Sequence, residues 1–203
     1  MFILALGVPF AINSNLGISP VNAWPFTWHL IFDITVGTAT TIFFSACILF
    51  QIILLRKQFK WYNLTQIVFS FLFGVFLDIC IFFLGDLSIP TYAGQLAMLL
   101  IGIFLIATGL SIYLEAKLVS LPSEGAVQAL VQKLPKSNFA KIKVWFDCAL
   151  ISLAIITSFI FLNGLYGIRE GTVIAAICVG KTIPLTRKFV IPIIRKTGFY
   201  EIK

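Results

Sequence analysis

The stretch Val36–Lys60 reads VGTATTIFFSACILFQIILLRKQFK, and it decides the class of fold. Its first twenty residues, Val36–Leu55, contain no charged side chain, and three basic residues follow within the next five positions. An α-helix of about 20 apolar residues crosses the roughly 30 Å of hydrocarbon in a bilayer. Basic residues directly after such a helix mark the cytoplasmic side of the membrane. The stretch therefore predicts a transmembrane helix that ends in a cytoplasmic loop.

Further apolar runs occur on both sides of this stretch. They cover Met1–Leu16, which is short, Tyr62–Leu84, Ala93–Leu114, Lys143–Asn163 and Gly171–Phe189. Of the 203 residues 60% are apolar and only 11% are charged, and the mean hydropathy is +1.03. A soluble domain carries about 25% charged residues, so this composition excludes soluble enzymes, secreted disulfide scaffolds and disordered tails. The sequence predicts an all-α, polytopic membrane protein with six transmembrane helices.

The basic residues predict the orientation of these helices. The net charge is +7, and thirteen of the fifteen Lys and Arg residues fall in segments 56–60, 117–143 and 187–203. With these segments in the cytoplasm, the loop 85–92 lies outside, and it contains no Lys or Arg. The positive-inside rule then places both termini in the cytoplasm. The charges form no basic groove or stripe, so no nucleic-acid partner is expected, and an anionic-substrate site is the alternative to a purely topological role.

A weak internal repeat divides the chain into residues 1–92 and 93–203. A shift of 102 positions aligns Pro20 with Pro122, and each half then contains a span, a proline loop, a short helix and two further spans. Three spans per half is an odd number, so the second copy must insert upside down. Inverted repeats of this kind build several secondary transporters. The first span is shorter than its counterpart, which predicts either a partial crossing or a chain start further upstream.

A short helix is expected after each proline loop. Pro122 suits the first turn of a helix because its missing N–H has no helical partner there. Apolar residues then recur at helical spacing, with Glu124, Gln128 and Gln132 on another face. The segment after Pro20 is richer in Trp and Phe. Two interpretations stay open: interfacial helices anchored by tryptophan, and re-entrant half-helices that direct their N-termini at a substrate.

Ionisable side chains inside the predicted spans are candidates for a site. A charge near the bilayer centre costs roughly 3 kcal/mol or more, so it usually faces a partner or water. Asp78 lies one helical turn after Gly74, and Lys181 follows Gly180, the residue that aligns with Gly74 after a four-residue gap. We hypothesise that Asp78 and Lys181 pair across the interface between the halves, as either a functional or a purely structural ion pair.

No metal, redox or catalytic site is predicted. The four cysteines lie in apolar runs without CxxC spacing, which indicates buried free thiols. The chain has one histidine and no metalloprotease, serine-hydrolase or phosphate-loop motif. Lys143 and Asp147 have the i, i+4 spacing of a local helix pair. We therefore expect no cofactor and no enzymatic activity, with an intramembrane enzyme as the alternative.

Three motifs follow one another in order along the chain: Asn15–Pro20 (NLGISP), Gly74 with Asp78, and Glu170–Gly180 (EGTVIAAICVG). Together they resemble the YczE/YyaS/YitT family of bacterial membrane proteins over essentially the whole chain. The resemblance implies a bacterial inner-membrane protein but no particular activity. The sequence departs from the family pattern at Asn22, where an acid is common, at Leu121, where a small residue is common, and at Lys181, where proline or an apolar residue is common.

We expect a small secondary transporter that rocks one half against the other, with its substrate site between the halves. The candidate substrate-binding residues are Asn15, Gly17, Ser19, Pro20, Asn22, Gly74, Asp78, Pro122, Ser123, Glu124, Gly180 and Lys181. The alternatives are a non-transporting accessory or scaffold subunit and a lipid-handling protein. The expected partners are the lipid bilayer, a small-molecule or lipid ligand, and further copies of the chain or another membrane protein.

Overall fold

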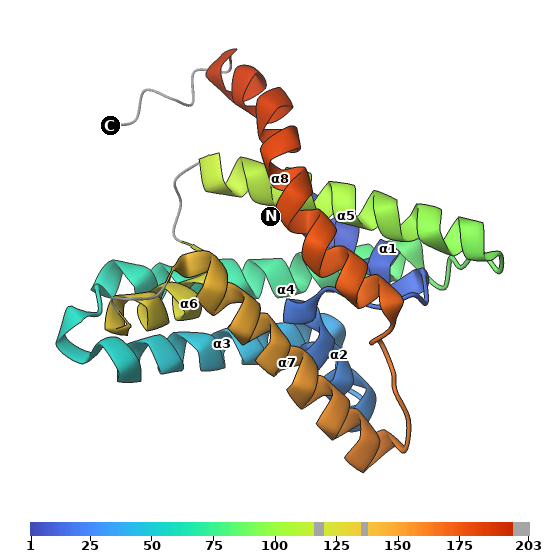
Figure 1. Ribbon diagram of the computed structural model, residues 1–203, viewed down its shortest axis with the longest axis horizontal. Helices are drawn as coiled ribbons and strands as arrows, with labels where there is room; N and C mark the ends of the chain where they lie inside the picture. The colour runs from blue at the N-terminus through green and yellow to red at the C-terminus, as the bar shows by residue number, and fades with distance from the viewer. Residues whose placement is uncertain (116–119, 135–137, 197–203) are drawn as a thin grey trace.

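The computed structural model describes residues 1–115, 120–134 and 138–196. Over these residues the chain consists of helices joined by turns and contains no strand, which confirms the predicted all-α class (Figure 1). Lys117, Lys136 and Lys203, which contribute to the predicted orientation, lie outside the described residues.

The described residues form eight α-helices and two short 3-10 helices. The α-helices are α1 (Phe2–Asn13), α2 (Pro20–Phe32), α3 (Val36–Leu55), α4 (Thr65–Leu84), α5 (Tyr92–Glu115), α6 (Pro122–Lys133), α7 (Phe139–Leu162) and α8 (Glu170–Lys196). The 3-10 helices Arg56–Gln58 and Trp61–Leu64 connect α3 to α4. The two short helices expected after the proline loops are confirmed as α2 and α6, and each has its proline in the first turn.

Four helices are long and apolar enough to cross a membrane. They are Val36–Gln58, Trp61–Leu84, Tyr92–Tyr113 and Phe139–Leu162, which match four of the six predicted spans. The other two predicted spans do not meet this standard in the described residues. Helix α1 has only 12 residues, and α8 contains two prolines and the charged residues Lys181, Arg187 and Lys188, which lower its hydropathy.

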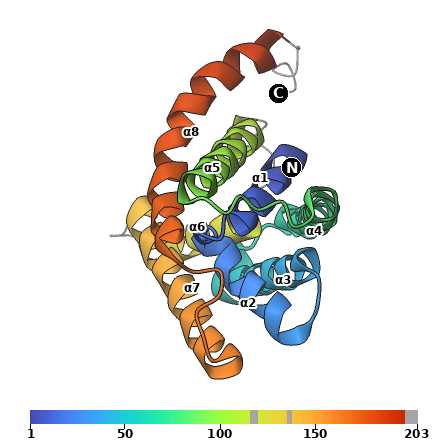
Figure 2. The ribbon, with the colours of Figure 1, turned by 90° about the vertical axis from the view of Figure 1, so that its right-hand side faces the viewer.

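The helices pack in a definite pattern. Helix α1 lies against α4 and α5, and α8 lies against the other side of α5. Helix α3 lies against α4, while the two short helices α2 and α6 each pack against both α3 and α7. In Figure 1 α3, α4 and α5 follow the long axis of the molecule, and α7 and α8 cross it obliquely. Figure 2 views α3, α4 and α5 nearly end-on and shows α7 and α8 together along one side of them.

Small residues let the central helices approach closely. A Cβ placed on Gly7 of α1 would lie 2.7 Å from the Gly102 carbonyl oxygen of α5. The core also contains Phe43, Phe44 and Phe73, whose rings pack against one another in tilted pairs. Close backbone contact through small residues is typical of helix packing in membranes, where no hydrophobic effect drives helices together.

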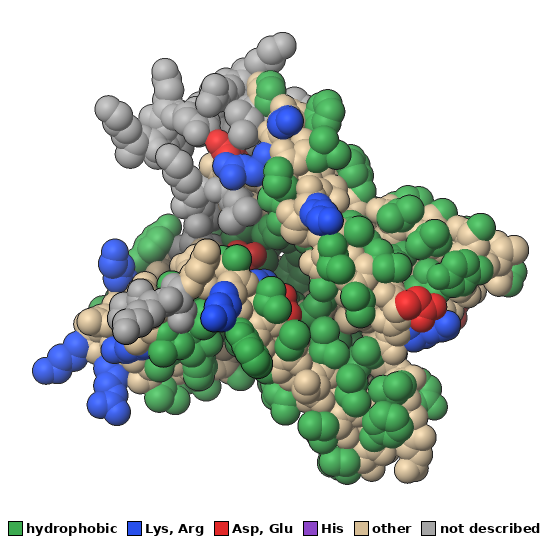
Figure 3. Space-filling model, viewed as in Figure 1, with side chains coloured by type: hydrophobic (Ala, Val, Ile, Leu, Met, Phe, Trp, Pro, Cys, Tyr) green, Lys and Arg blue, Asp and Glu red, His purple; other side chains and the backbone are tan. Residues whose placement is uncertain are grey.

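The outer surface is strongly apolar. Phe82 and Phe83 at the end of α4 expose more than 80% of their surface, and Trp145 on α7 exposes 68%. Figure 3 shows hydrophobic side chains over the visible faces of α5, α7 and α8. A soluble monomer rarely exposes such extended apolar surface. The fold is that of a helical membrane protein.

Candidate functional site

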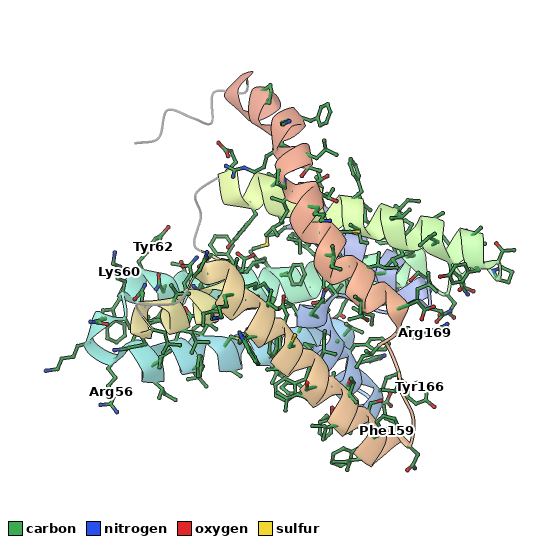
Figure 4. All side chains as sticks on the ribbon, in the orientation of Figure 1. Arg56, Lys60, Tyr62, Phe159, Tyr166 and Arg169 are labelled. Carbon is green, nitrogen blue, oxygen red and sulfur yellow. The ribbon has the colours of Figure 1, made fainter. Side chains whose placement is uncertain are left out.

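A polar cavity lies at the end of the molecule where α3 joins α4 and meets α6. Its volume is about 280 Å³, and we call it the amide pocket. It is lined by Gln51, Leu55, Tyr62, Asn63, Gln66, Ser120, Gly125, Gln128, Ala129 and Gln132. Figure 4 labels Tyr62 at this end of the molecule, together with Arg56 and Lys60. Among these lining residues five carry a side-chain carboxamide and none carries a formal charge at neutral pH.

Two buried glutamines form the fixed wall of the amide pocket. Gln51 and Gln66 are 1% and 2% exposed. Gln51 Nε2 donates to Gln66 Oε1 at 3.0 Å and to the Pro122 carbonyl oxygen at 3.1 Å, which ties α3, α4 and α6 together. Gly125 permits this arrangement, because a Cβ there would lie 2.6 Å from Gln51 Oε1. The pocket is therefore built on a polar link between both halves of the chain.

A second cavity of about 380 Å³ lies where α1 and α2 meet the connection between α7 and α8. We call it the loop pocket, and it is lined by Ile12, Asn15, Gly17, Ile18, Phe26, Leu30, Leu165, Tyr166, Gly167 and Arg169. Figure 4 labels Tyr166 and Arg169 along this connection. Compared with the amide pocket, its wall is largely apolar, with Arg169 as the single charged side chain among these residues.

The predicted motif Asn15–Pro20 is anchored to this connection by backbone hydrogen bonds. Ile18 N donates to the Gly167 oxygen at 2.9 Å, and Gly171 N donates to the Leu16 oxygen at 2.7 Å. Gly17 adopts a φ of +120°, and a Cβ there would lie 2.5 Å from Thr172 Oγ1. This position therefore requires glycine for both its conformation and its close contact with α8.

Polar residues lie beside the two prolines at the starts of α2 and α6, and neither helix start has a side-chain cap hydrogen bond. Asn22 is buried, and its Nδ2 donates to Ser19 Oγ at 3.1 Å next to Pro20. Ser123 is also buried, in the first turn of α6 beside Pro122. The two pockets are lined by other residues, and not by Ser19, Asn22 or Ser123.

Asp78 stabilises the start of α3. Its Oδ1 accepts from Gly37 N at 2.7 Å, and its Oδ2 accepts from Thr35 Oγ1 at 2.7 Å. Gly74, one turn earlier on α4, contacts the same region, since a Cβ there would lie 2.7 Å from the Gly37 carbonyl oxygen and would also clash with Thr41. An acidic group at a helix N-terminus satisfies free N–H groups and interacts favourably with the helix dipole.

The expected ion pair between Asp78 and Lys181 is not formed. Lys181 is exposed on α8, and no atom lies within 4 Å of a Cβ placed on its neighbour Gly180. Helix α8 packs against α5, whereas α4 packs against α3 and α1, so the two charges belong to different interfaces. The predicted residues thus fall into separate groups, at the loop pocket, at the starts of α2 and α6, between α3 and α4, and on the exposed side of α8.

A charged cluster lies between α6 and α7. Lys143 forms an ion pair with Asp147, as the spacing predicted. Burial raises the pKa of Glu124 above its usual range, while the charge of Lys143 opposes this shift and that of Asp147 adds to it. Figure 3 shows the surface hollowed between α6, α7 and α8, with acidic and basic side chains at the bottom of the hollow. In the described part of the chain no three His, Cys, Asp or Glu residues could hold a metal ion.

Gln51 and Gln66 are not among the site residues predicted from the sequence. The available signal was a single glutamine within each of two predicted transmembrane helices. Gln128 and Gln132 were placed on one face of the short helix after Pro122, and that face does line the amide pocket.

These features define a helical membrane protein whose cavities lie between elements from the two halves of the chain. The chain belongs to a family of unknown function, DUF6198, whose model matches residues 1–188. It is 31% identical over 134 residues to the uncharacterized membrane protein YczE of Bacillus subtilis (strain 168), covering 66% of this chain and 60% of that protein. It is 28% identical over 123 residues to the uncharacterized protein YyaS of the same strain, covering 60% of each chain.

The resemblance expected from the sequence motifs is thereby confirmed for YczE and YyaS. The chain spans about 60% of the length of these curated relatives. No solved structure matches it.

Proposed function

We propose that this protein is a small secondary transporter that moves an unidentified small molecule by alternating access between two inverted repeats. The observation that carries the proposal is the position of the two pockets. The amide pocket lies between α6 and the α3–α4 connection, and the loop pocket lies between α2 and the α7–α8 connection. Each pocket thus combines the short helix of one half with the connection between the last two helices of the other half.

The lining residues of the two pockets follow the sequence repeat. Ser120, Gln128 and Gln132 of the amide pocket lie 102 positions after Ile18, Phe26 and Leu30 of the loop pocket. The same shift aligned Pro20 with Pro122. An accidental pair of cavities has no reason to keep this register, so the correspondence supports a duplicated architecture with one pocket at each side of the membrane.

The helix packing supports the same relationship. In the repeat, α1 corresponds to α5, α2 to α6, α3 to α7 and α4 to α8. The α1–α4 contact then corresponds to α5–α8, the α3–α6 contact to α2–α7, and the α2–α3 contact to α6–α7, and all six contacts occur. Both short helices pack between α3 and α7 instead of covering the outside, which favours the re-entrant interpretation. The remaining two spans of a six-span topology would then be α1 and α8.

The α3–α4 contact breaks the correspondence, because α7 and α8 do not pack in the same way. Helices α3 and α4 are closely packed through Gly37 and Gly74, while the equivalent Gly180 of α8 faces open space. Alternating access requires that two similar halves adopt different conformations, which they exchange during transport. The closed α3–α4 pair and the separated α7 and α8 support one such asymmetric state.

The distribution of charge supports an inner-membrane location with the amide pocket at the cytoplasmic side. Arg56, Lys57, Lys60 and Lys133 are exposed at that end of the molecule. At the loop pocket Arg169 is paired with Glu170 at 3.1 Å, which cancels its charge. This asymmetry agrees with the positive-inside rule.

A metabolite comparison tests the proposal. Cells that lack the protein, cells that overexpress it and cells that overexpress the Gln128→Phe variant are compared for metabolites inside the cells and in the medium. We expect at least one metabolite to shift between cells and medium with the wild-type chain but not with the variant. Unchanged profiles, combined with stoichiometric purification of another membrane protein, would favour the accessory-subunit alternative, and a co-purified lipid would favour lipid handling.

A further inference from the structure

We propose that the amide pocket binds an uncharged, strongly hydrogen-bonding solute of about the size of a monosaccharide, one that bears hydroxyl or carboxamide groups. This inference rests on the proposed function and names the substrate class of the same protein.

The buried glutamines offer free hydrogen-bonding groups to the cavity. Gln51 uses both N–H groups of its amide, one on Gln66 and one on Pro122. Gln51 Oε1 and Gln66 Nε2 have no hydrogen bond of their own among the described residues. Both atoms remain partly accessible. Among the described residues, the completely buried side-chain atoms without a hydrogen-bond partner are Trp24 Nε1 and Thr108 Oγ1, and neither glutamine atom is one of them. One free acceptor and one free donor therefore reach the pocket from side chains that are almost entirely buried.

The fold itself does not require this polarity. In the loop pocket the positions of Gln128 and Gln132 are occupied by Phe26 and Leu30. A polar side chain that is buried without a partner is unfavourable, and one that is only partly satisfied costs about 1–3 kcal/mol. This cost applies to Gln51 and Gln66, which are almost entirely buried, and not to Gln128 and Gln132, which are exposed. A ligand that completes the hydrogen bonds of the two buried glutamines is the reason we assign to their polarity.

The charges point to an uncharged ligand. Among the described lining residues no side chain is ionised at neutral pH, whereas an ionic ligand needs an opposite charge when it leaves water. Figure 4 shows Arg56 and Lys60 directed outward from this end of the molecule. Carboxamides both donate and accept, as do hydroxyl and amide groups of a solute. The volume of about 280 Å³ admits a single sugar-sized molecule.

The test compares three sugars of similar size and different charge. The purified full chain in phosphatidylcholine nanodiscs is heated with N-acetylglucosamine, which is neutral, with glucosamine at pH 6.5, which is cationic, or with glucose 6-phosphate, which is anionic. A ligand that binds only the folded state raises the Tm in proportion to the logarithm of its concentration above Kd. We expect the neutral sugar to raise the Tm by a few degrees and the two charged sugars to have little effect.

The variant Gln128→Phe/Gln132→Leu copies the lining of the loop pocket and should abolish this rise while leaving the Tm without sugar unchanged or higher. Gln58→Leu removes a nearby exposed glutamine that does not line the pocket and should keep the rise. No rise with the neutral sugar, or a rise that survives the double variant, overturns the inference.

The outcome also separates this inference from the proposed function. If only a charged sugar raises the Tm, and the double variant loses this rise, the ligand does not belong to the uncharged class, but the proposed transport function still stands. Binding of the neutral sugar without its uptake into vesicles supports the pocket and contradicts transport of that solute.

Discussion

Gly74 and Gly180 occupy equivalent positions of the predicted repeat but have different surroundings. A Cβ on Gly74 would clash with Thr41 and the Gly37 carbonyl, whereas a Cβ on Gly180 would meet nothing within 4 Å. Forcing extra atoms into a close contact costs about 1–3 kcal/mol. We expect Gly74→Ala to lower the free energy of unfolding by this amount in detergent. Gly180→Ala is the matched control and should be neutral or slightly stabilising, since alanine favours helix. Equal destabilisation by both variants would contradict the packing described for α3 and α4.

Asp78 has a structural role that can be separated from any role of Lys181. Asp78→Ala removes the acceptors of Gly37 N and Thr35 Oγ1. Because hydrogen bonds to a charged group contribute about 1.5–3 kcal/mol, we expect a loss of roughly 2 kcal/mol of stability in thermal denaturation. Lys181→Ala should have no effect, and the double variant should show additive changes. A coupling between the two sites would restore the hypothesis of an Asp78–Lys181 ion pair.

Glu124 makes stability depend on pH. Its pKa is raised in the folded protein from an ordinary value near 4.5, chiefly by burial. The folded state therefore keeps a proton that the unfolded state has lost, so stability falls as the pH rises from about 4.5 through the folded pKa. Glu124→Gln should remove this fall and raise the Tm at pH 7. Glu170→Gln is the control, because the pKa of this exposed glutamate is lowered, and it should give no such gain. An unchanged pH profile in Glu124→Gln would show that another group controls the dependence.

At the scale of elements, the predicted ends of α3 coincide with the observed ones. The predicted ends of α4, α5 and α7 differ from the observed ones by only a few residues. A long apolar run forms a transmembrane helix for reasons that are local to the run. Helix α8 was predicted less well, since Gly171–Phe189 is only part of the helix Glu170–Lys196 and is less apolar than the other spans. The neighbours of each helix could not be predicted, because helix packing depends on surfaces that are far apart in the sequence.

The α5–α8 interface offers a direct test of this packing. Ser111 Oγ and Thr186 Oγ1 lie 2.6 Å apart and both residues are buried. In a chain whose four native cysteines are replaced by serine, Ser111→Cys with Thr186→Cys should form a disulfide under mild oxidation. Ser111→Cys with Thr182→Cys, one turn away on α8, should cross-link less efficiently. The measurement is the shift in electrophoretic mobility without reductant, and similar cross-linking of both pairs would indicate a mobile or different interface.

At the scale of the whole molecule, the proposed inverted repeat predicts which loops share a side of the membrane. In the same cysteine-free chain, Lys57→Cys, Asp86→Cys and Tyr166→Cys place single thiols in the connections α3–α4, α4–α5 and α7–α8. A maleimide that cannot cross membranes should label the last two in intact cells and the first only after permeabilisation. Labelling of Lys57→Cys and Tyr166→Cys from the same side would contradict the inverted topology and the assignment of one pocket to each side.

The sequence by itself determined that this chain is an all-helical membrane protein, where its four most apolar spans lie, where the two proline-initiated helices begin, and to which family it belongs. These properties follow from the hydropathy and residue order of continuous segments. Only the tertiary structure decided that Asp78 binds the start of α3, that Lys181 is exposed, and that Gln51 and Gln66 meet Pro122 around a polar cavity. Such contacts join residues up to 71 positions apart, and they depend on how the helices cross, which no local pattern specifies.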